Sequence, residues 1–462
     1  MKINNHLHNY DIYPKVFPEN KEIEICIKPL GKHVEFSADA DYRIVVCPFF
    51  TGVPHNYPEL ENFVEITPVL GDDGVLRFTH AFKDEQEHYI RLYDDNEDDP
   101  KKIFQLSVYS LKEDLVGRYP FKGDLHMHTC RSDGNQSPAI VSSYYRKYGY
   151  DFFAITDHRR YYPALEAMDA FKDVPIEFKI LPGEEVHLPR VGCYNNDVHI
   201  VNFGGKYSVN ALISDSAHNL EVGTSESLRS YEGKECPEII TPEQYKDEVL
   251  ALAETLDIPD GVPKFSYASC VWIFNHIKNA EGLGIFAHPY WISNVIQVPE
   301  VLTDYLLETK PFDAFEVLGG ELNYEQNGFQ TQKYYEDRAK GRNYPIVGST
   351  DSHSCFNNDK ALCASTIIFS PENEREALID SVKKFYSVAI DSISTEFRIV
   401  GDFRLSKYAC FLMQNYFPLH DDLCYEEGRL MKDYACGDSD AGETLKFISG
   451  RMAKQRRKYF AF

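Results

Sequence analysis

The sequence predicts an α/β protein with three parts: an N-terminal β-sandwich, a domain of repeated βα units, and a helical C-terminal extension. Residues up to about 117 alternate apolar and polar positions with period two, as antiparallel strands do. After Gly117, short apolar runs are separated by helix-like stretches, and metal-ligand-type side chains follow many of those runs. We therefore expect domains at 1–117, 118–395 and 396–462.

The N-terminal part predicts antiparallel strands with one buried face. Turn signals such as Gly71-Asp-Asp-Gly74 separate the alternating runs. Strands are expected at 22–28, 42–46, 75–79, 88–92 and 104–109. This pattern favours a β-sandwich, in which His80 and His88 are ordinary strand residues.

The second part predicts a parallel sheet, either open or closed into a barrel. Strands are expected at 152–155, 178–181, 198–203, 284–287, 314–318 and 345–347. Helices are expected at 138–148, 163–172, 270–280, 330–339 and 371–386. Side chains at the C-terminal ends of many different strands converge on one point if the strands form a ring, so a TIM-like barrel is favoured.

Two segments fall outside this repeat. Residues 205–268 form a polar, acidic stretch too long for a simple loop, which predicts a partly helical insertion and leaves open a role as a lid over the site. Beyond residue 395 an apolar helical segment at 408–413 precedes a basic last helix around 451–458. A nucleic-acid-binding arm is one reading of that helix, but a solvated helix C-terminus is favoured.

Composition limits the classes of function. The chain has 462 residues, 43% of them hydrophobic and 26% charged, and a formal net charge of −24, which disfavours stable binding to duplex nucleic acid. The 11 cysteines form no CxxC pair and are expected to be reduced. No secretory signal and no apolar run of about 18 residues is evident. A cytoplasmic protein without membrane contact is therefore expected.

Nine side chains suited to metal binding are the most informative feature of the chain. They are His126, His128, Asp133, His158, Glu185, His199, His288, Asp351 and His353. Oxygen and nitrogen ligands without a cysteine pattern suit Zn, Mn or Fe. The set predicts a hydrolytic site with two or three divalent metal ions.

Two spacings within this set predict shared ligation. His126 and His128 are two residues apart on an expected strand, so both rings point to the same side and can hold one metal. Asp351 and His353 repeat the spacing, which is expected to place both side chains together.

A carboxylate that follows an expected glycine turn at Gly183 is the predicted bridge between two metals, which lie roughly 3.5–4 Å apart in such sites. Glu185 is favoured for this role, with Glu184 turned outward. Asp133, His158 and His353 then form a candidate third site.

The motifs that carry these residues resemble a known family. They are Asp124-Leu-His126-Met-His128-Thr with Ser132-Asp133-Gly134, Thr156-Asp157-His158, Gly183-Glu184-Glu185, His199, Ala287-His288-Pro289 and Gly348-Ser-Thr-Asp351-Ser-His353. Their types and order resemble the polymerase and histidinol phosphatase (PHP) family over about residues 120–370. The resemblance implies a distorted (βα)7 barrel that binds two or three divalent metals and hydrolyses phosphoesters. The Ser132-Asp133-Gly134 variant is similar to the subgroup that acts on nucleotides or short RNA.

The resemblance also implies a ligand assignment. His126, His128, Glu185 and Asp351 would hold the first metal, Glu185, His199 and His288 the second, and Asp133, His158 and His353 the third. His187 departs from the family pattern, in which a small polar residue is commoner at this position. His187 is therefore left out of the ligand set, and we interpret it either as a surface histidine or as a histidine that supports a ligand.

The hypothesis is a phosphoesterase in which metals activate a water for in-line attack on a small anionic phosphoester. The candidate catalytic residues are Asp351, His353 and Glu185. The candidate phosphate-binding residues are Arg131 and Arg159. Asp157 either orients His158 or caps a helix.

Two alternatives stay open. One is an amidohydrolase or deaminase-type hydrolase that uses the same metals. The other is a non-catalytic metal-binding scaffold with a ligand-binding β-sandwich. The substrate, the metal and the oligomeric state are left open.

Overall fold

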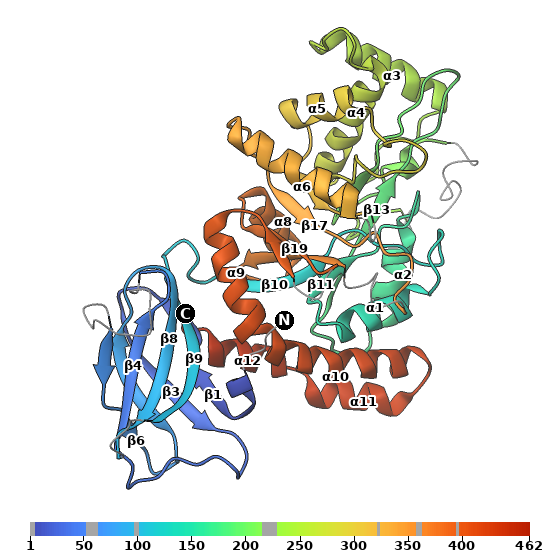
Figure 1. The fold of residues 1–462 in the computed structure, drawn as a ribbon. Helices are drawn as coiled ribbons and strands as arrows, with labels where there is room; N and C mark the ends of the chain where they lie inside the picture. The colour runs from blue at the N-terminus through green and yellow to red at the C-terminus, as the bar shows by residue number, and fades with distance from the viewer. Residues whose placement is uncertain are drawn as a thin grey trace. The chain divides into compact units, whose positions relative to one another are not determined.

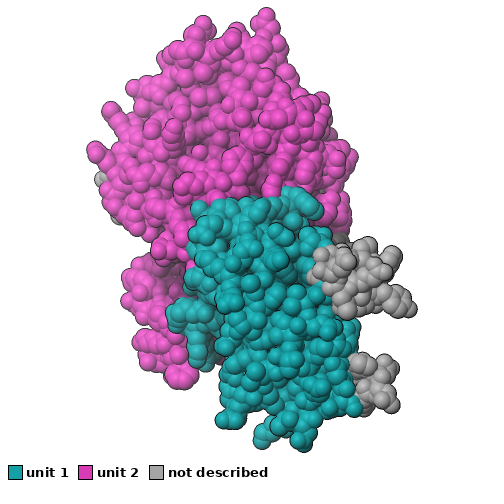
Figure 2. All heavy atoms as spheres, turned by 90° about the vertical axis from the view of Figure 1, so that its left-hand side faces the viewer, with its two compact units in different colours: residues 1–118, 403–423, 450–462 teal, residues 119–402, 424–449 magenta. Residues whose placement is uncertain are grey.

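The computed structural model describes residues 5–51, 63–96, 101–214, 229–320, 324–356, 363–393 and 397–462. It is a mixed α/β structure with several sheets and a helical C-terminus (Figure 1). Two compact units divide the chain (Figure 2): Met1–Arg118, Phe403–Leu423 and Gly450–Phe462 form unit 1, and Tyr119–Asp402 and Cys424–Ser449 form unit 2. The residues expected to form one C-terminal extension are thus shared between both units. Among the described helices, none combines the length and hydropathy that a transmembrane helix requires.

Unit 1 contains two sheets that bury one common set of apolar side chains, including Ile25, Ile44, Ile90 and Phe104. One sheet has the order β1 (Tyr10–Tyr13), β3 (Glu22–Pro29), β7 (Leu76–Ala81), β6 (Val69–Leu70). The other has the order β2 (Val16–Pro18), β9 (Lys101–Leu111), β8 (Gln86–Asp94), β4 (Tyr42–Pro48), β5 (Val64–Ile66). All five strands predicted in this region form, because alternating apolar positions give each strand one face to bury.

The C-terminal residues of unit 1 dock on its strands. Helix α9 (Phe403–Asn415) places Tyr408 against Tyr109, with ring centroids 4.9 Å apart. Arg404 forms ion pairs with Glu85 and Asp114. After α12 (Arg451–Tyr459), the N–H of Ala461 donates to the carbonyl of Val16 at 2.9 Å. The basic last helix therefore ends in unit 1.

Unit 2 contains two mixed sheets. The first has the order β12 (Lys179–Leu181), β11 (Phe152–Ala154), β10 (Tyr119–Asp124), β18 (Ala364–Ser370), β19 (Ser387–Asp391), β20 (Arg398–Val400). The second has the order β13 (Gly183–Val186), β14 (Ile200–Phe203), β15 (Leu283–Phe286), β16 (Ala314–Leu318), β17 (Ile346–Gly348).

The pairing in these sheets corrects the expectation of a parallel sheet. The pairs β10–β11, β11–β12, β15–β16 and β16–β17 are parallel, but β14 is antiparallel to both β13 and β15. Strand β14 runs the other way because no crossover helix separates it from β13, and a parallel return needs such a crossover. Strands β18–β20 were not predicted; β18 pairs antiparallel with β10 and with β19, and β19 pairs antiparallel with β20.

The five helices predicted for unit 2 form and differ from the prediction at their ends. They are α1 (Pro138–Lys147), α2 (Tyr162–Ala170), α4 (Lys264–Asn279), α6 (Tyr324–Ala339) and α8 (Arg375–Lys383). Helix α3 (Pro242–Thr255) lies in the expected partly helical insertion, and α5 (Glu300–Thr309) was not predicted. Helix α10 (Phe417–Ala435) begins in unit 1 and ends in unit 2, where α11 (Ser439–Ile448) follows. Fully buried Arg146 of α1 holds the second half of α10 through an ion pair with Glu427.

The predicted insertion at 205–268 contributes several of its described side chains to the core. Tyr207, Val209, Leu212 and Tyr245 are buried in the same apolar cluster as β14 and α4. Residues 215–228 lie outside the described residues. The described part is partly helical, as predicted, and its apolar side chains complete the core beside β13 and β14, whereas a role as a lid stays a prediction.

Lys15 leads to a prediction about stability. Its side chain is fully buried in unit 1, and Nζ has no hydrogen-bond partner among the described residues, although it lies 4.8 Å from the centre of the Tyr459 ring. Burial lowers the pKa of this ammonium to about 8. An unfolded lysine has a pKa of about 10.4. The cost of charging Lys15 in the fold is therefore fully present below pH 8 and disappears as the pH rises toward 10.

We expect Lys15→Met to raise the free energy of unfolding by up to about 3 kcal/mol near neutral pH. This gain should shrink steadily between about pH 8 and pH 10. Urea denaturation of both proteins across this range measures it. A difference between them that is the same at every pH would show that the ammonium charge is not the cause.

Candidate metal centre

The nine predicted residues come together at the ends of six strands of unit 2. His126 and His128 follow β10, His158 follows β11, and Asp133 lies in the turn after His128. Glu185 lies inside β13, so the expected glycine turn is wrong, and His199 immediately precedes β14. His288 follows β15, and Asp351 and His353 follow β17.

Backbone hydrogen bonds hold these strand ends side by side. The N–H of Asp351 donates to the carbonyl of His126 and that of His128 to the carbonyl of Ser352, both at 2.9 Å. The N–H of Arg159 donates to the carbonyl of Glu185 at 3.0 Å. Arg159 and Asp351 adopt φ values of 59° and 51°, in the left-handed region that non-glycine residues rarely enter. The site therefore stores local backbone strain, as functional sites often do.

The first cluster consists of His126, His128, Glu185 and Asp351. Asp351 Oδ1 lies 3.4 Å from His126 Nε2 and 2.8 Å from His128 Nε2. Glu185 Oε2 lies 3.4 Å and 3.5 Å from the same two nitrogens. Four ligand-type atoms thus face a common point, and three of the four side chains are fully buried.

The second cluster shares Glu185 and adds His199 and His288. Glu185 Oε1 lies 2.8 Å from His199 Nδ1 and 3.5 Å from His288 Nε2. Asp351 also reaches this cluster, since its Oδ2 lies 3.7 Å from His288 Nε2. The two oxygens of Glu185 therefore face two different clusters, which is the arrangement of a bridging carboxylate.

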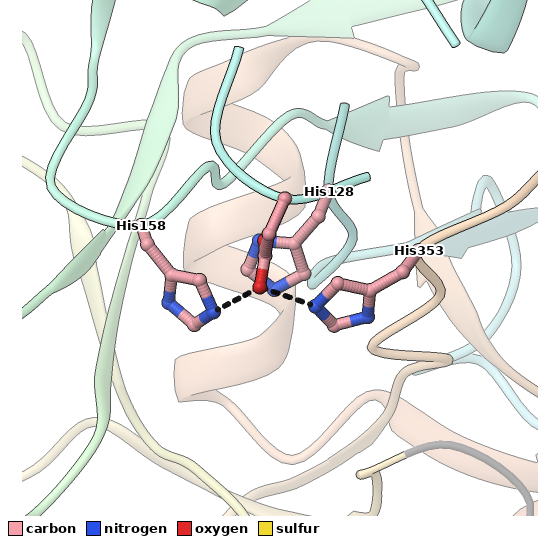
Figure 3. A group of neighbouring side chains, drawn as sticks. His128, His158 and His353 are labelled. Carbon is pink, nitrogen blue, oxygen red and sulfur yellow. Dashed lines mark ion pairs between the residues drawn. The ribbon is translucent and has the colours of Figure 1, made fainter. Parts of the chain in front are cut away.

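The third cluster consists of Asp133, His158 and His353. Asp133 Oδ2 lies 3.5 Å from His158 Nε2 and 3.4 Å from His353 Nε2. Figure 3 shows the rings of His158 and His353 directed toward one carboxylate oxygen, with His128 behind them. His353 thus faces this cluster while Asp351 faces the first two. The expectation that they lie together fails because the left-handed Asp351 breaks the strand alternation.

Glu184 does not turn outward as expected. It points to the opposite side of β13 from Glu185, but that side is also fully buried. Its carboxylate accepts hydrogen bonds from Ser208 Oγ at 2.7 Å and from Asn210 Nδ2 at 2.8 Å. Glu184 therefore fixes residues 208–210 against the strand that carries Glu185.

The carboxylates and imidazoles shift one another's protonation. Burial alone would raise the pKa of Glu185, but His158, His199 and His126 hold it well below its ordinary range. Burial lowers the pKa of His128 to about 4, so its ring is neutral near pH 7. Burial opposes protonation of His126, yet Asp351, Glu316 and Glu185 raise its pKa well above the ordinary value. The negative electrostatic potential of these three carboxylates favours a proton on His126, and it also favours a metal cation beside that ring.

Unpartnered buried atoms show that the site fits divalent metals. His126 Nε2, His199 Nδ1, His288 Nε2 and both oxygens of Glu185 have no hydrogen-bond partner among the described residues. A buried polar atom without a partner costs about 1–3 kcal/mol, so native proteins rarely keep several together. Neutral imidazoles and carboxylates are the donor set of Zn, Mn and Fe sites. Metal ions bound in these clusters would be coordinated by these atoms, so each atom would gain a partner.

The supporting roles of two carboxylates, Glu316 and Asp124, were not predicted from the sequence. Glu316, fully buried in β16, lies 3.0 Å from His126 Nδ1 through Oε1 and accepts from the N–H of His288 through Oε2, also at 3.0 Å. Asp124 accepts from Thr350 Oγ1 at 2.6 Å and thereby joins the end of β10 to the loop that carries Asp351. A lone glutamate inside the apolar run 314–318 was the available signal for Glu316.

Two residues near the candidate ligands, Asp157 and Arg131, make contacts other than those expected. Asp157 neither orients His158 nor caps a helix: its carboxylate accepts from Thr129 Oγ1 at 2.6 Å and from Ser132 Oγ at 2.5 Å. It therefore shapes the turn that carries Asp133. Arg131 pairs in bidentate fashion with Glu166, at 2.8 Å and 2.7 Å. Arg159 Nε, in contrast, is buried without a hydrogen-bond partner among the described residues.

Comparisons with known proteins give one segment of sequence similarity and several distant structural matches. No family model matches the chain. A segment of 108 residues is 32% identical to the DNA polymerase/3'-5' exonuclease PolX of Bacillus subtilis, over 20% of this chain and 19% of that protein. A two-domain protein from Bacteroides vulgatus, which contains a predicted PHP-like metal-dependent phosphoesterase, is 17% identical with a TM-score of 0.36, over 59% of this chain and 65% of the other.

A third match carries a different description. An amidohydrolase from Chromobacterium violaceum, solved with sulfate and no metal, is 17% identical with a TM-score of 0.29, over 50% of this chain and 87% of the other. The chain spans less than two thirds of PolX and of the Bacteroides protein. It resembles the PHP family, as its motifs predicted, while its substrate stays a prediction.

The contacts of Glu316 lead to a prediction about metal affinity. Glu316→Ala removes the acceptor for His126 Nδ1 and should weaken divalent-metal binding by about 10- to 100-fold. Glu316→Gln keeps an oxygen of similar reach and should give an intermediate affinity. Competition with a chromophoric chelator measures each value. An unchanged affinity in Glu316→Ala would show that this carboxylate does not position a ligand.

Proposed function

We propose that this chain is a metal-dependent hydrolase that cleaves a small phosphoester. The convergence of three ligand clusters around the buried, bridging Glu185 is the observation that carries this proposal. The proposed ligands are those that the family resemblance implies, with two or three ions of Zn, Mn or Fe. We also propose that the two sheets of unit 1 form a β-sandwich and that unit 2 is a distorted barrel.

Bound divalent cations would supply Lewis acidity toward phosphoryl oxygens and lower the pKa of a water to near neutrality. The residues of the chain hold those cations and orient the substrate. Glu185 and Asp351 each offer two oxygens to different clusters, which keeps the first two positions close together. Glu316 and Asp124 hold the surrounding backbone and His126 in place. Such rigid placement avoids reorganisation during the reaction.

The third cluster is the proposed entrance for the substrate. The side chains of Asp133, His158 and His353 are 55%, 26% and 25% exposed, whereas His126, His128 and Glu185 are fully buried. Arg159, which follows His158 in the chain, is the proposed contact for the phosphate group. Duplex nucleic acid is not the proposed substrate, because the net charge of −24 opposes its binding.

Substitution of Asp351 tests the proposed function. Asp351→Asn should lower turnover on the order of 10³-fold or more and reduce bound metal, with the fold retained by circular dichroism. Asp304→Asn, which alters a half-exposed carboxylate on α5, is the matched control. The substrate panel should contain mononucleotides, dinucleotides, short RNA, sugar phosphates, amides and amino-nucleobases. Turnover of amides alone would favour an amidohydrolase, and no turnover by metal-loaded protein would reject a hydrolase.

The two candidate arginines allow a matched comparison. Arg159→Gln should raise the KM for the phosphoester by roughly tenfold or more and leave metal content unchanged, because a charge-assisted contact to phosphate is lost. Arg131→Gln should change KM less than about threefold, because that guanidinium already pairs with Glu166. Steady-state kinetics of both variants measure the difference. Equal effects would remove Arg159 from the substrate site.

A further inference from the structure

His187 is an imidazole at the metal centre that the family assignment leaves out. It comes directly after β13, two residues beyond Glu185, so both side chains point to the same side of the chain. The N–H of His187 donates to Asn210 Oδ1 at 3.0 Å, and Asn210 Nδ2 donates to the carbonyl of Glu185 at 3.2 Å. Asn210 thus holds this strand end in place, and the His187 side chain is 19% exposed.

Three ligand-type atoms form a small triangle here. His187 Nε2 lies 3.0 Å from His158 Nδ1 and 3.5 Å from Glu185 Oε2. His158 Nδ1 lies 2.6 Å from the same oxygen of Glu185. Atoms that share one ion at about 2.1 Å lie roughly 3.0–3.4 Å apart in octahedral or tetrahedral coordination. Small shifts would therefore let all three atoms bind one cation.

Hydrogen bonds alone do not satisfy this triangle. A neutral imidazole carries one N–H and one lone pair. If His158 Nδ1 carries the proton, it donates to His187 Nε2 at 3.0 Å, and Glu185 Oε2 is left without a donor of its own. If His187 Nε2 carries the proton, it donates to His158 Nδ1, and Glu185 Oε2 again has no donor although it lies 2.6 Å from that nitrogen. Glu185 Oε2 is fully buried without a hydrogen-bond partner among the described residues. A cation satisfies all three atoms at once.

The triangle is separate from the third cluster. His158 faces Asp133 through Nε2 at 3.5 Å, and it faces Glu185 and His187 through Nδ1. The two ring nitrogens point in different directions, so His158 lies between two candidate cation positions. A neutral His158 binds a cation at one of them, and it binds both only if its remaining N–H proton is released to solvent. The neighbouring ring of His199, with its centroid 4.2 Å from that of His187, closes another side.

We propose that His158 Nδ1, Glu185 Oε2 and His187 Nε2 form a further divalent-cation position in this chain. The inference rests on the metal centre of the proposed function, and it adds His187 to the proposed ligands of that centre. Two imidazoles and one carboxylate suit Zn²⁺ or Fe²⁺ better than Mg²⁺ or Ca²⁺, which prefer oxygen.

Metal analysis of the full-length protein tests this position with Zn²⁺ as the probe. His187→Gln should bind one equivalent fewer after dialysis, or bind one equivalent at least about tenfold more weakly in chelator titrations. The matched control is His276→Gln, which makes the same change in a half-buried histidine of α4 beside Trp272. Unchanged content and affinity in His187→Gln would overturn the inference and leave the proposed function intact. A wild-type protein that binds no Zn²⁺, Mn²⁺ or Fe²⁺ would instead reject the proposed function.

Anomalous diffraction from wild-type crystals soaked in Zn²⁺ tests the same position if His187→Gln does not fold. The expected result is a peak about 2.0–2.2 Å from His187 Nε2, His158 Nδ1 and Glu185 Oε2. Peaks in the other clusters without one here would reject the position.

Discussion

The buried carboxylate of Glu185 is the interaction on which the site depends. One oxygen faces His126, His128, His158 and His187, and the other faces His199 and His288. A charge this deeply buried is stable only when opposite charge or hydrogen-bond donors surround it. The imidazoles keep the pKa of Glu185 low, and divalent cations would add the remaining positive charge. The surrounding strands hold this arrangement, because each contributes candidate ligands at one end.

The fold brings these ends together by joining two mixed sheets. Pro182 separates β12 from β13, so the chain leaves one sheet at Leu181 and enters the other at Gly183. Bridges between Met127 and Ser352 and between His158 and Glu185 then connect strand ends that belong to different sheets. The segment that follows β14 covers the far side of β13, where Glu184 binds Ser208 and Asn210. What resembled an insertion in the sequence is therefore structural support for Glu185.

The sequence predicted much of the fold and of the candidate site. Strand positions followed from apolar runs, and ligand candidates followed from histidines and carboxylates placed after those runs. Strand direction did not follow: β14 and β18–β20 are antiparallel, and local periodicity carries no information on direction. Asn210 and Glu316 were missed because their roles depend on partners far away in the chain, as with Glu316 and His126.

The amino-acid sequence alone identifies nine ligand-type side chains, their order, and a resemblance to a family of metal-dependent phosphoesterases. The folded structure divides these side chains among separate clusters. It directed Asp351 and His353 to different clusters, paired Arg131 with Glu166 and left Arg159 Nε without a partner among the described residues. It also brought His187 within 3.0 Å of His158. Residue types and spacing follow from the chain alone, whereas the direction of each side chain depends on backbone angles and contacts that only the folded protein establishes.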